Sequence, residues 1–334
     1  MIILNAIYDN CLVYHLVIEA VPELYRHNIV LGFTFGSIFQ ENSTILKKDA
    51  TDIITTKRYD NKNWRIVKTF RLGARRPTPF FKPLETRIID RLSNKRKLGM
   101  LLNNTGISPN IYLSTNAVPK DVDKLWFVKD SVNDYTQDIQ CVRTAELHGF
   151  ELNPKYIIQE GVTDLDLFDD RKYTLRVFGL LHDKKLYMFR HFVRFMHYDR
   201  YNANSTDVKV HVNHLIKYGS EHRLPIVSDE PLIECISENM RGLCSKIGHV
   251  LQETTTHTYQ LIGLDYVITR DKKAILIEIN ANPVINNSAQ FKNNPEYLND
   301  GYNVLTQVNI PMVTNFLKCV VGLHHDDCIL IGSA

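Results

Sequence analysis

The chain has 334 residues, of which 44% are hydrophobic and 23% charged, with a formal net charge of +3. This length exceeds one ordinary hydrophobic core and predicts two or three lobes, and the composition excludes a disordered or low-complexity protein. The longest uncharged run, residues 301–317, is interrupted by polar residues and a proline, which is not typical of a bilayer span. Six cysteines without a CxxC or metal-ligand spacing predict reduced thiols and a cytoplasmic protein.

Positive charge is concentrated near the front of the chain. Residues 47–97 contain 16 Lys or Arg against 5 Asp or Glu, a local net charge of +11, while the remainder has 24 against 32. Such a surface favours a polyanionic partner, either an acidic peptide or a nucleic acid. The segment has no zinc-ligand spacing, RNP-like motif or uninterrupted basic helix, which disfavours nucleic acid. Ordinary solvated charge is the alternative interpretation.

The first 90 residues are predicted to form a small α/β domain with a basic surface. Apolar runs at 2–7 and 29–33 predict strands, and the pattern over 11–25 predicts a helix between them. The absence of a GxGxxG motif gives no support to a dinucleotide site. Three X-Pro bonds and a glycine within residues 71–83 predict a loop, which either connects lobes or grips an acidic partner.

A second unit is predicted over residues 91–165. The sequence predicts a basic helix capped by Ser93, followed by strands starting at Ile111 and spanning 125–129 and 156–159. Lys129 ends one of these strands. A lysine at a strand end beside a cleft is suited to hold phosphate oxygens, although a single lysine is more often an ordinary surface residue.

The third unit, residues 166–334, is predicted to begin with a hairpin of strands 173–181 and 185–193. Side chains on a strand repeat every two residues, so basic residues gather on strand faces: Lys172 and Arg176 on the first strand, Arg190 and Arg194 on the second. Such a group of cations fits the clamping of phosphates during phosphoryl transfer, with a solvated sheet face as the alternative. Further along, Ser228 is predicted to cap a long amphipathic helix that covers the sheet.

The chain is organised around a second hairpin at residues 261–283. Apolar strands at 264–269 and 274–279 flank a polar turn, and a tip at Asp271 and Lys272 places Asp265 directly opposite Glu278. Asn280 lies on the same face. Facing carboxylates repel unless a cation lies between them, and two carboxylates with one amide oxygen suit Mg²⁺ rather than Zn²⁺. The alternative, an exposed hairpin with scattered charges, conflicts with the apolar character of both strands.

The order of these motifs resembles that of ATP-grasp enzymes, and within that superfamily tubulin tyrosine ligase with its glutamylase and glycylase relatives. RKYTLRVFGLL at 171–181 is similar to the family's (R/H)KFD(L/I)R strand, and RHFVRF at 190–195 to its G-x-x-R strand. HVNHLIK at 211–217 is similar to the LTNH segment. LIGLDYVI followed by LIEINANP resembles the pair LGxDFxx and LIEVNxxP. The resemblance covers roughly residues 93–284.

The resemblance implies a mixed α/β (α+β) protein with an ATP-grasp fold, in which the antiparallel sheets of two lobes enclose ATP. The residues implied to ligate Mg²⁺ are Asp265, Glu278 and Asn280. The residues implied to bind ATP are Lys129, Lys172, Gln159, Glu160, Val162, Asn213 and His214, of which the hinge 159–162 reads adenine. The arginines implied to stabilise an acyl phosphate, or to hold the incoming amino acid, are Arg176 and Arg194.

The activity implied by the resemblance is the ATP-dependent, ADP-forming addition of a free amino acid to an acidic protein tail such as that of tubulin. Three departures from the family pattern bear on this expectation. Residues 130–140 contain no glycine where the family has a Gly-rich loop, and Thr174 and Val212 replace Asp and Thr. The open alternatives are a ligase for a small molecule or free peptide, a non-catalytic nucleotide-binding relative and, more remotely, an inositol phosphate kinase.

Overall fold

The computed structural model describes residues 2–6, 17, 21, 29–33, 82–131, 139–147, 152–212, 223–281, 283, 285 and 303–334. Within these ranges the protein is mixed α and β, with three sheets whose strands pair mostly antiparallel. This confirms the predicted class at that level. The smallest sheet pairs β1 (Ile2–Ala6) with β2 (Ile29–Phe33) in parallel, while the helix predicted at 11–25 lies largely outside the described residues.

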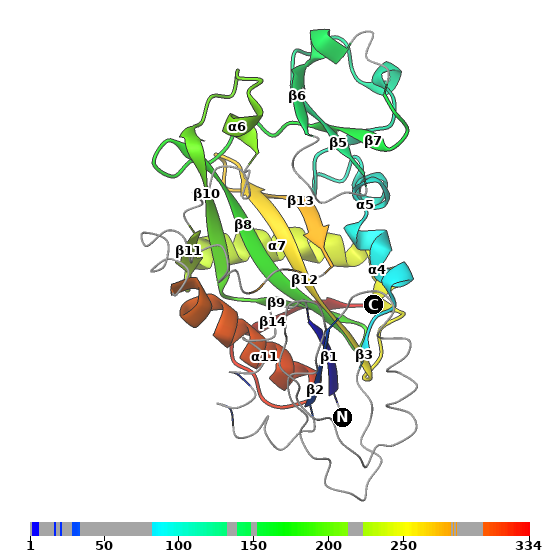
Figure 1. The fold of residues 1–334 in the computed structure, drawn as a ribbon, viewed down its shortest axis with the longest axis vertical. Helices are drawn as coiled ribbons and strands as arrows, with labels where there is room; N and C mark the ends of the chain where they lie inside the picture. Colours follow the sequence, from blue (N-terminus) through cyan, green and yellow to red (C-terminus); the bar gives the residue numbers. More distant parts are fainter. Residues whose placement is uncertain are drawn as a thin grey trace, which may run out of the picture.

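An eight-stranded sheet forms the body of the protein (Figure 1). Its main path is β11 (Arg223–Ile226), β10 (Phe192–Arg200), β8 (Arg171–His182), β12 (Thr258–Ile268) and β13 (Ala274–Asn280). At the other end of β8, β9 (Lys185–Phe189) pairs with β8 and with β14 (Cys328–Ser333), and β3 (Lys82–Pro83) pairs in parallel with β12. Strand β12 is buried at every position from Tyr259 to Ile268, as expected for a strand covered on both faces.

Helices cover both faces of this sheet, because alternate residues of β8 and β12 are apolar on both sides. One core joins the sheet to α4 (Thr86–Ser93), α5 (Lys95–Leu102), α7 (Glu230–Lys246) and α8 (Gly248–Leu251). The other core joins the opposite face to α11 (Ile310–Val320), which follows a π-helical turn at Leu305–Asn309. Figure 1 shows α7 and α11 on the two sides of the long strands.

A four-stranded antiparallel sheet lies at the top of Figure 1. Its strand order is β4 (Ile111–Tyr112), β7 (Tyr156–Glu160), β5 (Leu125–Asp130) and β6 (Gln140–Arg143). Trp126 is fully buried in its core, and its indole Nε1 donates to Thr144 Oγ1 at 2.9 Å. Gly161 follows β7 and donates to the carbonyl of Leu125 at 2.8 Å. A Cβ at Gly161 would lie 2.6 Å from that oxygen, so the close approach requires glycine.

Two predicted helix starts are each wrong by one residue. Ser93 is the last residue of α4, and Asn94 caps α5 instead, because its side chain accepts from the amides of Arg96 and Lys97. Similarly, Asp229 rather than Ser228 caps α7 by accepting from the amide of Leu232 at 3.1 Å. In both places adjacent residues are good caps, and the sequence alone does not choose between them. Helix α4 also crosses the boundary predicted at residue 90.

The predicted strand 185–193 is two strands. Strand β9 ends at Phe189, and β10 begins at Phe192 and pairs with β8 further back along its length. The turn between β8 and β9 is a two-residue turn, with Asp183 and Lys184 both at positive φ, as in type I′ hairpins. Strand β8 therefore pairs with β9, β10 and β12, which makes it the central strand of the protein.

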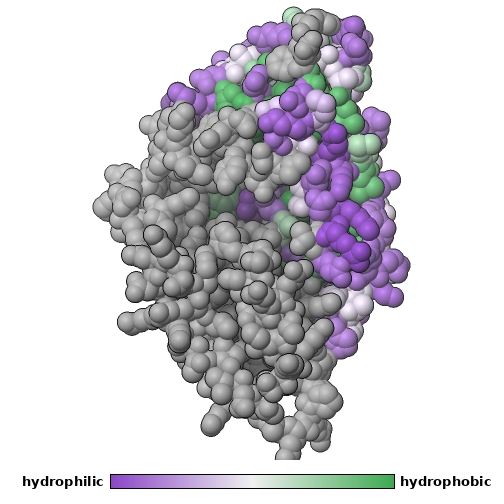
Figure 2. All heavy atoms as spheres, turned by 45° about the vertical axis from the view of Figure 1, so that its right-hand side comes forward, coloured by the Kyte–Doolittle hydropathy of each residue, from purple (hydrophilic) through white to green (hydrophobic). Residues whose placement is uncertain are grey.

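The side of the protein that carries α4 and α5 is mostly hydrophilic where it is described, with scattered hydrophobic residues (Figure 2). Several basic side chains there are paired with carboxylates: Arg87 with Glu85, Arg91 with Glu253, and Lys97 with Asp90. Most of the basic segment 47–97 lies outside the described residues. None of the helices in the described part of the chain is long and apolar enough to cross a bilayer.

Candidate active site

The hairpin of β12 and β13 places Asp265 directly opposite Glu278, which confirms the predicted register. The predicted two-residue tip is wrong. Thr269 N donates to Lys273 O, and Lys272 has φ +62°, so the loop has three residues, 270–272. This shifts the register by one residue, and a bulge between Asp265 and Tyr266 shifts it back. The two shifts cancel before the carboxylates are reached.

Asn280 joins the two carboxylates into one cluster, here called the acidic cluster (Asp265, Glu278 and Asn280). Its Nδ2 lies 3.2 Å from Asp265 Oδ2 and 3.4 Å from Glu278 Oε1. Asp265 is 7% exposed, so water neutralises little of its charge. Turning the Asn280 amide over would present three oxygen donors to the same point, since the two ends of an amide have the same shape.

The acidic cluster is the candidate cation site, and it contains only two carboxylates. Within the described ranges no group of three or more His, Cys, Asp or Glu side chains is arranged to hold a metal ion. The oxygen donors of the cluster fit Mg²⁺, which takes few protein ligands and completes its coordination with water and phosphate oxygens. A site for Zn²⁺ would need nitrogen or sulfur ligands that the cluster lacks.

Arg176 lies next to the acidic cluster, as expected from its position on β8. It pairs across the strands with Asp265, and its guanidinium forms a two-pronged ion pair with that carboxylate. The Nη2 atom donates to Asp265 Oδ2 at 2.8 Å. Gly263 leaves the space for this side chain, since a Cβ there would lie 3.0 Å from Arg176 Cδ. The guanidinium neutralises the more buried of the two carboxylates.

The two carboxylates are held in different protonation environments. Burial raises the pKa of Asp265, and Glu278 raises it further, against the opposing effect of Arg176. The pKa of Glu278 is lowered, because its cationic neighbours outweigh burial; they are Lys95, Lys129 and Arg176. Glu278 is therefore the carboxylate that stays ionised most readily. Asp265 takes up a proton first, at a pKa above its usual range.

Lys95 and Lys129 act on Glu278 from different elements, and Lys172 lies near Lys129. Lys129 is at the end of β5 and only 6% exposed, and Lys172 is on β8, where its Nζ donates to the carbonyl of His211 at 2.6 Å. Lys95 is the first residue of α5, with its Nζ 3.7 Å from Glu278 Oε2. Burial lowers the pKa of Lys129 and of Lys172 to about 8. The sequence pointed to Lys129 and Lys172, but Lys95 was missed.

Replacing Lys129 by methionine is expected to stabilise the protein by about 2–3 kcal/mol at pH 7, because burying its charged amine opposes folding. The folded pKa of Lys129, about 8, lies below the ordinary lysine value of 10.5. The Lys129 amine therefore keeps its proton to a higher pH in the unfolded chain than in the folded one. The wild type gains stability as the pH rises from about 8 to 10.5. The advantage of the variant should shrink over that interval in urea denaturation at pH 7 and pH 10.5. The exposed Lys246→Met is the control, and equal shifts in both variants would contradict the prediction.

Arg194 does not join the acidic cluster. It pairs with Leu175 on β8, whereas Arg176 pairs with Val193, so the two arginines lie on opposite faces of the sheet. The Arg194 guanidinium stacks 4.6 Å from the ring centre of Phe168 and 4.9 Å from that of Tyr173. The prediction that both arginines gather beside the carboxylates is therefore wrong for Arg194.

The predicted hinge, residues 159–162, begins in β7, and Gln159 lies across a pocket from residues of β13. Its first two residues are central in that sheet, because β7 pairs with both β4 and β5. The amides of Glu160 and Gly161 already donate to Asn110 O and Leu125 O. An adenine base would therefore be read by the Glu160 carbonyl or by Val162, and not by these two amides. Asn213 and His214, the remaining predicted nucleotide residues, lie outside the described part of the chain.

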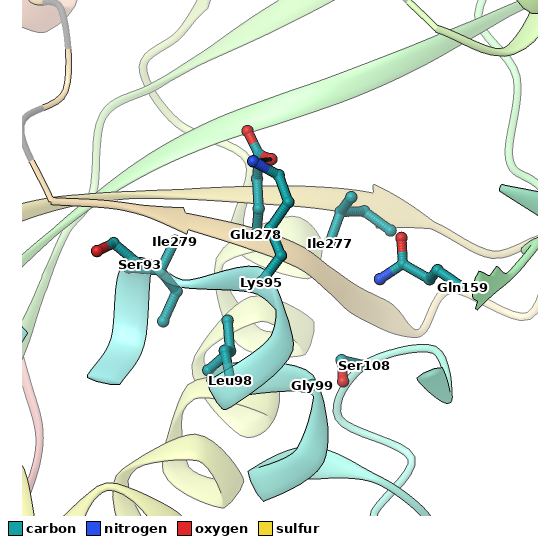
Figure 3. A pocket seen from close by; sticks show the side chains of 9 residues that line it. All are labelled: Ser93, Lys95, Leu98, Gly99, Ser108, Gln159, Ile277, Glu278 and Ile279. Carbon is teal, nitrogen blue, oxygen red and sulfur yellow. Dashed lines mark ion pairs between the residues drawn. The ribbon is translucent and has the colours of Figure 1, made fainter. Parts of the chain in front are cut away.

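A pocket lies between the two larger sheets, beside the acidic cluster (Figure 3). Its lining is Ser93, Lys95, Leu98, Gly99, Ser108, Gln159, Ile277, Glu278 and Ile279. In Figure 3 the charged ends of Lys95 and Glu278 lie together at one side, and Gln159 reaches in from β7. Apolar side chains from β13 and α5 form much of the remainder. The lining therefore combines apolar side chains with the Lys95–Glu278 ion pair.

Comparison with known proteins does not assign the chain to a family. No protein-family model matches it, and no curated protein matches it.

Proposed function

We propose that this protein is an ATP-dependent carboxylate–amine ligase of the ATP-grasp type. The observation that carries the proposal is the acidic cluster itself, in which Asp265, Glu278 and Asn280 meet on one sheet face among buried cations. Like charges that face each other with little access to water are costly, and such a cost is typical of sites that bind charged ligands. The cations come from both of the larger sheets, so a ligand between the sheets would contact both.

The proposed role of the acidic cluster is to hold Mg²⁺ together with ATP phosphate oxygens. Bound Mg²⁺ supplies neutralisation of phosphate charge. The chain's own contribution is placement: Lys95, Lys129 and Lys172 act as point charges for phosphate oxygens, and Arg176 holds Asp265 in position. The apolar part of the pocket, with Gln159 at its edge, is the proposed place for the base.

The proposed reaction forms an acyl phosphate from the acceptor carboxylate and the terminal phosphate of ATP, which releases ADP. The amine of an amino acid then attacks the acyl carbon, and phosphate leaves as the amide bond forms. No nucleophilic side chain is required, because positioning and charge stabilisation are the main sources of catalysis in phosphoryl transfer. The site offers buried cations for the transferring phosphate, which agrees with that requirement.

The proposed acceptor is an acidic protein tail, such as that of tubulin, because the sequence concentrates positive charge at residues 47–97. The described part of this segment holds several surface ion pairs, including Arg91 with Glu253 and Lys97 with Asp90. Exposed pairs of this kind contribute about 0–1 kcal/mol, so an acidic tail could replace them at low cost.

A non-catalytic nucleotide-binding protein is the second candidate. Arg176 engages both oxygens of Asp265, and Arg194 faces away from the cluster. The segment 130–140 also lacks glycine. These features favour binding without transfer. A ligase for a small molecule or free peptide differs from the first proposal only in its acceptor.

The test is intact-mass spectrometry of tubulin incubated with the protein, MgATP and a pool of amino acids, with ADP measured in the same tubes. A mass increment of one amino acid that is absent with Glu278→Gln would support the tagging ligase and name its donor. Unchanged tubulin with ADP release points to a different acceptor. Nucleotide binding without ADP release, with any acceptor offered, supports the non-catalytic protein.

A further inference from the structure

Two cysteines meet where α11 ends and β14 begins, away from the acidic cluster. Cys319 is the penultimate residue of α11 and 7% exposed, and Cys328 is the first residue of β14 and partly exposed. Both side chains pack in the core beside α11, and the Cys328 thiol is placed to donate a hydrogen bond to the Cys319 sulfur. The two cysteines are nine residues apart in the sequence, and this spacing did not predict that they meet. The turn of the chain between them brings them together.

The backbone holds the two thiols together from both sides. Helix α11 ends in a Schellman motif, in which Gly322 has φ +74°, its amide donates to Cys319 O, and Leu323 N donates to Lys318 O. On the other side, Arg190 N donates to Asp327 O at 3.0 Å, and Cys328 pairs with Phe189 on β9. The positions of the two cysteines are therefore set by regular structure on both sides.

The environment of Cys319 favours its thiolate. Its sulfur accepts hydrogen bonds from the thiol of Cys328 and from the hydroxyl of Tyr187, which lower the Cys319 pKa against the effect of burial. The pKa of Cys328 is raised by the same contact and by burial. By contrast, burial raises the pKa of Cys141 and of Cys235, so these thiols resist ionisation. The thiolate is the form of cysteine that reacts with oxidants and with disulfides.

We propose that Cys319 and Cys328 form a reversible intrachain disulfide in the presence of hydrogen peroxide. The Cys319 thiolate attacks one peroxide oxygen, the O–O bond breaks, and sulfenic acid and hydroxide are formed. The sulfur of Cys328 then attacks the sulfenic sulfur, and water leaves as the S–S bond forms. Two thiols and one peroxide give one disulfide and two waters. A dithiol such as dithiothreitol reverses the reaction by exchange.

The disulfide would tie the end of α11 to the edge of the main sheet. Helix α11 covers the sheet face that also carries the acidic cluster. Its core contacts include Tyr259 and Leu261, which point to the same face of β12 as Asp265 because they are an even number of residues away from it. Oxidation would therefore fix the helix that covers the sheet face on which the acidic cluster lies, further along β12. The dithiol does not depend on the proposed ligase activity.

The test maps cysteine alkylation in the full chain before and after mild peroxide, with Cys11 replaced by serine because it lies outside the described residues. We expect Cys319 and Cys328 to lose iodoacetamide labelling together, the chain to lose two hydrogens in mass, and one cross-linked peptide to appear. Dithiothreitol should restore both labels. Labelling of Cys141, Cys235 and Cys244 should be unchanged.

Unchanged labelling of both cysteines would overturn the proposal, and so would sulfinic acid on one of them without a cross-link. The Cys328→Ser variant gives a second measurement, because Cys319 should then proceed to sulfenic and higher acids instead of pairing. This outcome is read on the single chain by mass and needs no activity assay. Folding of the variant is checked by its thermal unfolding midpoint.

Discussion

Glu278→Gln is expected to abolish most ATP turnover, with a loss of about 10²–10³-fold. The substitution keeps the shape of the side chain and removes one of the two carboxylates of the acidic cluster. It also leaves Lys95 and Lys129 without the carboxylate that lowers the cost of burying them. Nucleotide binding measured with a fluorescent ATP analogue should lose most of its dependence on Mg²⁺, so that affinities in Mg²⁺ and in EDTA become similar.

The matched control is Glu234→Gln, which changes an exposed carboxylate that pairs with Arg241 on the surface of α7. Turnover and Mg²⁺ dependence should be unaffected there. Wild-type turnover in Glu278→Gln would contradict the role of the cluster. Wild-type Mg²⁺ dependence with lost turnover would show that Asp265 and Asn280 suffice for binding.

Arg176→Leu is expected to destabilise the protein by about 3–5 kcal/mol near neutral pH, because it leaves a buried carboxylate without its partner. The side chains of Arg176 and Asp265 are 18% and 10% exposed, so water compensates little. The pKa of Asp265, already raised by burial, rises further without the guanidinium. In the folded variant the Asp265 carboxyl then keeps its proton to a higher pH than it does in the unfolded chain. The stability of the variant therefore falls as the pH rises.

Urea denaturation should therefore show a smaller loss of stability in Arg176→Leu at pH 5 than at pH 7.5. The double variant Arg176→Leu/Asp265→Asn should regain most of the stability, since it removes the stranded charge. Arg241→Leu, at an exposed pair, is the control and should change stability by less than about 1 kcal/mol. If Arg176→Leu also changed stability by no more than this control, solvent would be screening the buried pair of Arg176 and Asp265.

The acidic cluster could be predicted from the sequence because strand alternation determines which residues share a face. The register of Asp265 with Glu278 was confirmed even though the loop was wrong, since the bulge between Asp265 and Tyr266 compensated for the extra loop residue. Loop length and bulges depend on backbone conformations, such as the positive φ of Lys272, that a polar tetrapeptide does not specify.

Arg194 shows the limit of the same reasoning. Its alternation along the strand was correct, but the pairing of β10 with β8 decides which face it occupies, and a one-residue difference moves a side chain to the other face. Lys95 was missed for a related reason. It reaches Glu278 from the first turn of α5, a helix distant in sequence from β13, and it looked like one of several basic helix residues.

The central position of β8 has a consequence for how the protein is made. The four-stranded sheet pairs residues no further apart than Ile111 and Gln159, so it can close soon after Glu160 is synthesised. Strand β8 must wait for β12, which begins at Thr258, and β9 must wait for β14 at the end of the chain. Non-local pairing of this kind slows folding and leaves strand edges exposed in the meantime. During translation the main sheet is therefore the part most open to aggregation, and ribosome-bound chains that end before Thr258 should be recognised by chaperones.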